Sequence, residues 1–230
     1  MSGHPGPGPA PSLIPAVPDQ SWLELFYDLA FAASIVVLSS TYSSYAGVGG
    51  VIWLGLVFSM IWSTWLSTTL MLGAGLVTTM WARALLLTQM VLVLSVAITS
   101  DYSQQDHSAA VGPLFAAVLV TLALLYRSAR RSAPGLDVAY RGHATRCVVA
   151  SSVFLLVPFL GWPWWYPLLW IAGISVFMLP TRSQERRLPM DSHHVVHRFG
   201  EFTIIMLGEV FLKLGITASQ EPLDRVDLIG

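Results

Sequence analysis

Long apolar runs limit what this chain can fold into. Short segments rich in turn-forming residues separate seven such runs, over residues 22–43, 51–72, 79–99, 109–126, 146–161, 164–179 and 196–216. A transmembrane helix needs about 20 apolar residues, so seven helices and their loops use nearly all of the 230 residues. Only 11% of the residues are charged, whereas a soluble domain carries about a quarter. We therefore predict an all-α, polytopic integral membrane protein built as a bundle of about seven transmembrane helices.

The remaining segments complete the predicted organisation. Residues 1–20 hold prolines among glycines, a composition that blocks helix formation and predicts a disordered cytoplasmic tail. The helical bundle is predicted over residues 21–216, and residues 217–230 are expected to form a short C-terminal tail or the start of a truncated segment. The fifth and sixth runs are short and are joined by an aromatic turn, which predicts a helical hairpin.

Arginine is concentrated in alternate loops, and this predicts the orientation of the chain. The loops after the fourth and sixth runs hold most of the arginines, and Arg83 lies near the start of the third run. The loops after the first, third and fifth runs contain neither Lys nor Arg. Because positive charge stays on the cytoplasmic side, we predict a cytoplasmic N-terminus and place the end of the seventh run outside.

Ionisable side chains inside the apolar runs are the main functional signal. A charged side chain costs about 2.5–3.5 kcal/mol at the centre of a membrane helix, so each one needs a partner or a task. Glu24 and Asp28 in the first run are four residues apart and therefore share one face of a helix. Gln89 in the third run is a further polar candidate for the bundle interior.

The seventh run carries a polar stripe. At about 100° per residue, its polar side chains fall within a sector of about 120°, and apolar side chains cover the opposite side of the helix. The stripe consists of His194, His197, Arg198, Glu201, Gly208 and Glu209, and the apolar side consists of Phe199, Phe202, Met206 and Val210. The seventh run therefore predicts a helix with one polar and one apolar face.

Depth in the membrane predicts which of these groups meet. The first and seventh runs both start on the cytoplasmic side, so a rise of about 1.5 Å per residue places the carboxylates of the first run level with His197, Arg198 and Glu201. One interpretation is a proton-handling or ligand-binding cluster, because imidazole titrates near neutral pH and a carboxylate can tune it. The other is a structural ion pair of Arg198 with Asp28 or Glu24 that holds two helices together.

Three further residues are candidates for the site. Glu209 lies two turns deeper, roughly 12 Å beyond Glu201, and Lys213 follows it at i+4 as an available partner. Trp62 and Trp65 of the second run lie mid-span instead of at the interface that tryptophan favours. These two rings either fill the bundle interior or offer their π faces to a cation.

Composition and motifs exclude several classes of ligand. A net charge of −1 without a long basic stretch gives nucleic acid no surface to bind. The single cysteine, Cys147, cannot form an internal disulfide. The histidines at 193, 194 and 197 have no acidic or thiolate ligand at a fixed spacing, so no metal site is expected. The chain has no glycine-rich phosphate loop, and we predict no cofactor.

Two motifs resemble those of a known family. The sequences WLELFYDL at 22–29 and RFGEFTIIMLGE at 198–209 are similar to the marker motifs of the bacterial low-temperature-requirement protein A (LtrA) family, and a looser similarity extends over residues 21–215. Glu24, Asp28, Arg198 and Glu209 match the motifs residue by residue. The resemblance implies a multi-pass protein of the bacterial plasma (inner) membrane whose biochemical activity is poorly defined and whose family name links it to growth in the cold.

Compared with the family it resembles, this chain departs from the usual pattern at two motif positions and in length. Members usually have Glu at the position of His197 and an apolar residue at that of Glu201, so the carboxylate of this chain is displaced by one helical turn. They are usually longer, with further spans after the second motif. The chain is therefore either a compact seven-span form or a truncation.

Three functions are compatible with these residues. Proton-linked transport or permeation of a small molecule uses the ionisable stripe as a relay. An enzyme acting on an apolar, lipid-like substrate would use Glu209 or Asp28 as the acid and the two tryptophans to stabilise a carbocation, as in isoprenoid cyclisation. A membrane sensor or assembly component needs no turnover. The expected partners are the lipid bilayer and a small-molecule or lipid-like substrate, without nucleic acid, and the oligomeric state stays open.

Overall fold

The computed structural model shows a helical protein. It describes residues 22–41, 48–73, 79–102, 108–132, 137–156, 159, 165–178 and 192–220. Within these ranges there are seven α-helices and no strands: α1 (Trp22–Thr41), α2 (Val48–Gly73), α3 (Met80–Tyr102), α4 (Ser108–Ser132), α5 (Asp137–Leu156), α6 (Trp165–Met178) and α7 (Ser192–Gln220). The all-α prediction is confirmed there. The predicted tail at 1–20 and residues 221–230 lie outside the described residues.

Several helices are longer than the apolar runs that predicted them. Helix α4 continues to Ser132 and helix α5 begins at Asp137, whereas the apolar runs end at 126 and begin at 146. Arginine is a strong helix former, so the arginine-containing segments at this end of the bundle remain helical after the apolar pattern stops. An apolar run therefore marks the part of a helix that suits lipid, and the helix itself extends further.

Four of the described helices are long and apolar enough to cross a membrane. Their apolar segments are Trp22–Ser40, Val48–Leu72, Met80–Ser100 and Ala110–Ala129. Helix α6 has 14 residues, a length of about 21 Å, whereas the hydrocarbon core is about 30 Å thick. Crossing by α5, α6 and α7 stays a prediction, as does the cytoplasmic position of the N-terminus.

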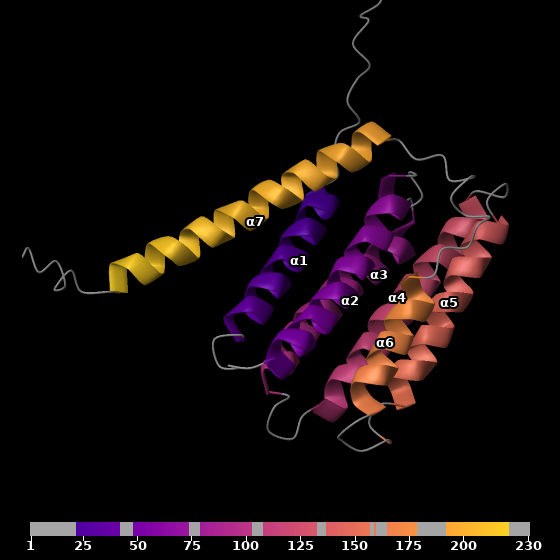
Figure 1. Cartoon of the computed structure of the whole chain (residues 1–230). Helices are drawn as coiled ribbons and strands as arrows, with labels where there is room; N and C mark the ends of the chain where they lie inside the picture. The colour runs from indigo at the N-terminus through magenta and orange to yellow at the C-terminus, as the bar shows by residue number, and fades with distance from the viewer. Residues whose placement is uncertain are drawn as a thin grey trace, which may run out of the picture.

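Six helices run side by side, and the seventh crosses them obliquely (Figure 1). Helix α1 packs on α2 and α3, and further contacts join α3 to α4, α4 to α5 and α5 to α6. Helix α7 contacts α1 and α2 with its first half, and its second half extends beyond α1 (Figure 1). The apolar side chains of that half, including Leu207, Phe211 and Leu214, are exposed. The bundle is therefore built by α1–α6, with α7 attached at one end.

Aromatic rings fill the interior between α4, α5 and α6. Phe154 of α5 and Trp170 of α6 lie edge to face with ring centroids 4.9 Å apart, and Phe115 of α4 lies 5.1 Å from Trp170. Gly173 of α6 allows this approach, because a Cβ atom there would lie 2.7 Å from the ring of Phe154. The predicted pairing of the fifth and sixth runs is confirmed by these contacts.

Candidate functional site

Asp28 and Arg198 form an ion pair in the interior of the molecule. Asp28 lies on α1 and Arg198 on α7, and both side chains have no exposed surface. Arg198 Nη2 donates to Asp28 Oδ1 over 2.5 Å, and Arg198 Nε donates to Asp28 Oδ2 over 3.3 Å. The guanidinium therefore binds both carboxylate oxygens, the geometry that makes such a pair strong and directional. The predicted contact between the first and seventh runs is confirmed.

A third helix contributes to the same carboxylate. Trp65 of α2 donates its indole Nε1–H to Asp28 Oδ1 over 2.8 Å, and the Trp65 side chain is fully buried. The backbone carbonyl of Glu24 accepts a long hydrogen bond of 3.5 Å from Arg198 Nη2. Asp28 therefore joins α1, α2 and α7 at one point.

The ion pair is costly to break in this position. Taking one charge away leaves the other buried without a counter-charge, which typically destabilises a protein by about 3–5 kcal/mol.

Arg198 Nη1 is also buried, and it donates no hydrogen bond to any residue in the described ranges. The Nη1 amino group of the arginine thus has two N–H donors left for oxygen atoms that the described side chains do not provide.

A second polar group lies next to the ion pair along α1. Tyr27 donates its hydroxyl hydrogen to Gln89 Oε1 of α3 over 2.9 Å, and Thr68 of α2 donates to the same oxygen over 3.2 Å. All three side chains are buried, which places Gln89 in the interior as the sequence indicated. Tyr27 was not among the residues expected from the sequence, although its position directly before Asp28 in the first motif was a signal.

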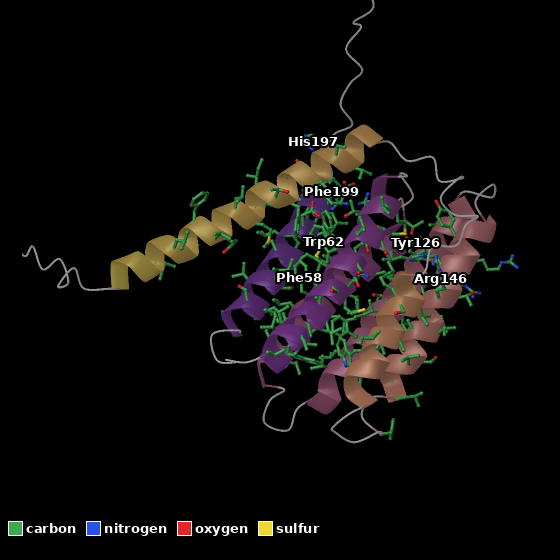
Figure 2. The ribbon with its side chains drawn as sticks, in the orientation of Figure 1. Phe58, Trp62, Tyr126, Arg146, His197 and Phe199 are labelled. Carbon is green, nitrogen blue, oxygen red and sulfur yellow. The ribbon has the colours of Figure 1, made fainter. Side chains whose placement is uncertain are left out.

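Aromatic rings cover the ion pair on the side of α2 and α7. Trp65 lies 4.5 Å from Phe202 and 5.0 Å from Phe199, measured between ring centroids. Trp62 lies 5.1 Å from Trp65 and 5.7 Å from Phe202, and in Figure 2 it is labelled close to Phe199 of α7, whose ring centroid is 6.1 Å away. The two tryptophans therefore pack against phenylalanines of α7 and exclude water from the charges.

His197 and Glu201 form a separate pair on the outer side of α7. His197 Nδ1 lies 3.2 Å from Glu201 Oε1, four residues along the same helix. The His197 side chain is 51% exposed and that of Glu201 is 24% exposed. The polar residues predicted to form one cluster thus divide into a buried ion pair and this outer pair.

Helix α7 does not turn its polar stripe inward, which corrects the prediction for its two faces. Phe202 was assigned to the side opposite Arg198, yet both side chains are buried on the same side of α7. Residues four apart on a helix differ by only about 40° in direction, so Arg198 and Phe202 are neighbours at the border between the polar and apolar sectors. This border faces the bundle.

Glu209 lies away from the ion pair. Glu209 is half-buried, and its position eleven residues after Arg198 places it about 16 Å further along α7. His194 belongs to the first turn of α7, but its side chain lies outside the described residues, as does that of Lys213. The predicted pairing of Glu209 with Lys213 therefore stays a prediction.

The described side chains do not include a metal centre. No group of three or more His, Cys, Asp or Glu residues is arranged to hold a metal ion in the ranges that the structure describes. The groups that can bind a ligand at the ion pair are the Arg198 guanidinium and the Asp28 carboxylate.

Comparison with known proteins identifies the family of this chain. A curated relative, an uncharacterized protein of Rhizobium meliloti (strain 1021), is 27% identical over 207 residues, which cover 85% of this chain and 50% of the relative. The chain thus spans about half the length of this relative. No solved structure matches the chain. The model of the family described as bacterial low temperature requirement A protein (LtrA) matches residues 19–229, and both marker motifs lie within that range. The chain belongs to the bacterial low temperature requirement A family.

Proposed function

We propose that the chain serves proton-linked transport or permeation of a small molecule across the bacterial plasma membrane. The observation that carries the proposal is the buried Asp28–Arg198 pair, to which Trp65 adds a third helix. Charged residues within membrane helices are expensive, and they commonly mark substrate or proton pathways. An apolar contact of the same volume would join the helices at equal or lower cost, so the charges themselves support a task.

The attachment of α7 supports a switching role for this pair. Helix α7 contacts α1 and α2, and the buried side chains among its described residues, Arg198 and Phe202, both lie in its first half. A proton on Asp28 removes the charge that Arg198 faces, and this weakens the bond between α7 and the other two helices. Proton uptake would thereby be linked to a movement of α7.

The chemistry of Arg198 indicates the class of substrate. When Asp28 is protonated, the guanidinium favours another anionic or carbonyl oxygen, and Nη1 has no hydrogen-bond partner among the described residues. We therefore infer a small molecule that carries such an oxygen and travels with the proton. The alternative of a carbocation-stabilising enzyme has less support, because Trp62 and Trp65 pack against Phe199 and Phe202.

Proton flux into proteoliposomes tests the proposal. The full chain is reconstituted with a pH-sensitive dye inside the vesicles, and an acid pulse is applied with and without a mixture of small organic acids outside. We expect acidification faster than in protein-free vesicles, and we expect Asp28→Asn to reduce it to the leak rate because an amide cannot carry the proton.

A matched control separates this effect from general damage to α7. Thr203→Val removes an exposed hydroxyl that, within the described residues, donates to the Phe199 carbonyl of its own helix over 2.7 Å, and we expect wild-type flux. Equal flux in the wild type and in Asp28→Asn would overturn the proposal.

A further inference from the structure

A basic groove lies between α4 and α5, on helices other than those that hold the ion pair. Its volume is about 300 Å³, and its lining includes Arg127 of α4 and Tyr140, Arg141 and Thr145 of α5. No acidic side chain is among its lining residues in the described part of the chain. The groove therefore presents positive charge together with hydroxyl groups.

The positions of Arg127 and Arg141 along α4 and α5 indicate that the groove lies at the level of lipid headgroups. The apolar segment of α4 ends at Ala129, so Arg127 lies in its last turn, and α5 begins at Asp137 on the same side. Leu124 on α4 and Val148 on α5 also line the groove, and both lie further from this end than the arginines. The polar end of the groove thus faces the interface, and its apolar end continues along the surface that meets acyl chains.

Tyr140 gives an independent sign of a ligand. Its side chain is 1% exposed and lines the groove, and its hydroxyl has no hydrogen-bond partner in the ranges that the structure describes. A buried hydroxyl without a partner costs free energy, so such groups are normally paired. An oxygen of a bound phosphate would accept the hydroxyl hydrogen.

We propose that this groove binds the headgroup of an anionic phospholipid, with the phosphate between Arg127, Arg141 and the Tyr140 hydroxyl and one acyl chain along Leu124 and Val148. Basic pockets between membrane helices bind anionic headgroups through this combination of charge and hydrogen bonding. The proposal does not depend on the function proposed for Asp28 and Arg198, because it uses different helices and no proton transfer.

Lipid binding to the purified full chain tests the proposal. Native mass spectrometry measures the affinity for phosphatidylglycerol and for phosphatidylcholine of the same acyl chains. A thermal melt with inorganic phosphate alone tests the free anion. We expect preference for phosphatidylglycerol, and roughly a thirty-fold loss of affinity in Arg127→Gln with Arg141→Gln, since each interfacial arginine contributes about a fivefold factor.

Two further variants and one control variant keep the result decisive. Arg127→Gln changes an exposed residue alone, so the fold is retained, and about a fivefold loss is expected. Tyr140→Phe removes only the hydroxyl and should also weaken binding. Arg83→Gln changes an exposed arginine near the start of α3, outside the groove, and should bind as the wild type does.

Three outcomes would overturn the proposal. Equal affinity for the two lipids shows that the headgroup charge is not recognised. An equal loss in Arg83→Gln shows a diffuse attraction instead of a site. Full stabilisation by inorganic phosphate alone shows that a free anion, and not a lipid, is the ligand.

Discussion

At the scale of single residues, Asp28 combines burial, charge and three helices. Both of its carboxylate oxygens accept hydrogen bonds from Arg198, and one also accepts the Trp65 indole N–H. A structural ion pair and a transport switch both need this geometry. They differ in what an uncharged replacement of both residues does. A structural link survives it, whereas proton transport is lost.

The stability of variants at the pair should be non-additive. Asp28→Asn and Arg198→Met each leave one charge without its partner, and we expect each to lower the free energy of unfolding by about 3–5 kcal/mol. The double variant removes both charges, so most of this loss should be recovered. Melting temperatures of the three variants in one detergent measure the coupling. Additive losses would show that the two residues do not interact.

Trp65→Phe tests the third hydrogen bond at this carboxylate. The substitution removes the indole N–H and leaves both charges and an aromatic ring, so we expect a loss of about 1.5–3 kcal/mol, the range for a hydrogen bond to a charged group. A matched change at Trp62→Phe removes no hydrogen bond to Asp28 and should cost less. Equal losses in the two melts would mean that packing, not the hydrogen bond, holds Trp65.

At the scale of elements, the two halves of α7 should respond differently when a phenylalanine side chain is replaced by alanine. Phe202 is 3% exposed and packs on Trp65, whereas Phe211 is 69% exposed. We expect Phe202→Ala to cost about 1–3 kcal/mol, because in lipid the cavity is the main loss, and Phe211→Ala to change the melting temperature little. A large effect at Phe211 would show that the second half of α7 is packed in the protein.

Helices α5 and α6 offer a second test of packing. A Cβ atom at Gly173 would lie 2.7 Å from the Phe154 ring, so we expect Gly173→Ala to cost about 1–3 kcal/mol. Phe154→Leu frees space, and Gly173→Ala in that background should cost less. Melting temperatures of the two single variants and the double variant measure this coupling.

The helices and the α1–α7 contact were predictable from the sequence, whereas the rotation of α7 was not. Apolar runs and the depth of charged residues depend only on the position of each residue along its own helix. The inward side of α7 depends on which of two neighbouring sectors fits Trp62 and Trp65 better. Phe202 and Arg198 fit there together, so the border between the sectors is buried. A projection of α7 alone holds no information on that fit.

At the scale of the whole molecule, the arginine distribution predicts one topology. Cys147 is buried, and in a Cys147→Ala background a cysteine placed at Gln104 should react with an impermeant thiol reagent added to intact cells. A cysteine placed at Pro134 should react only after the cells are opened. The reverse pattern would invert the chain and place the basic groove in the outer leaflet.

We propose that the charges at Asp28 and Arg198 carry the function as well as joining helices. Proton flux in proteoliposomes containing Asp28→Asn with Arg198→Met tests it most directly, because this double variant should be folded and free of an unpaired buried charge. We expect a melting temperature close to that of the wild type and a flux equal to the leak of protein-free vesicles. Wild-type flux in the folded double variant would contradict it and leave the pair a purely structural link.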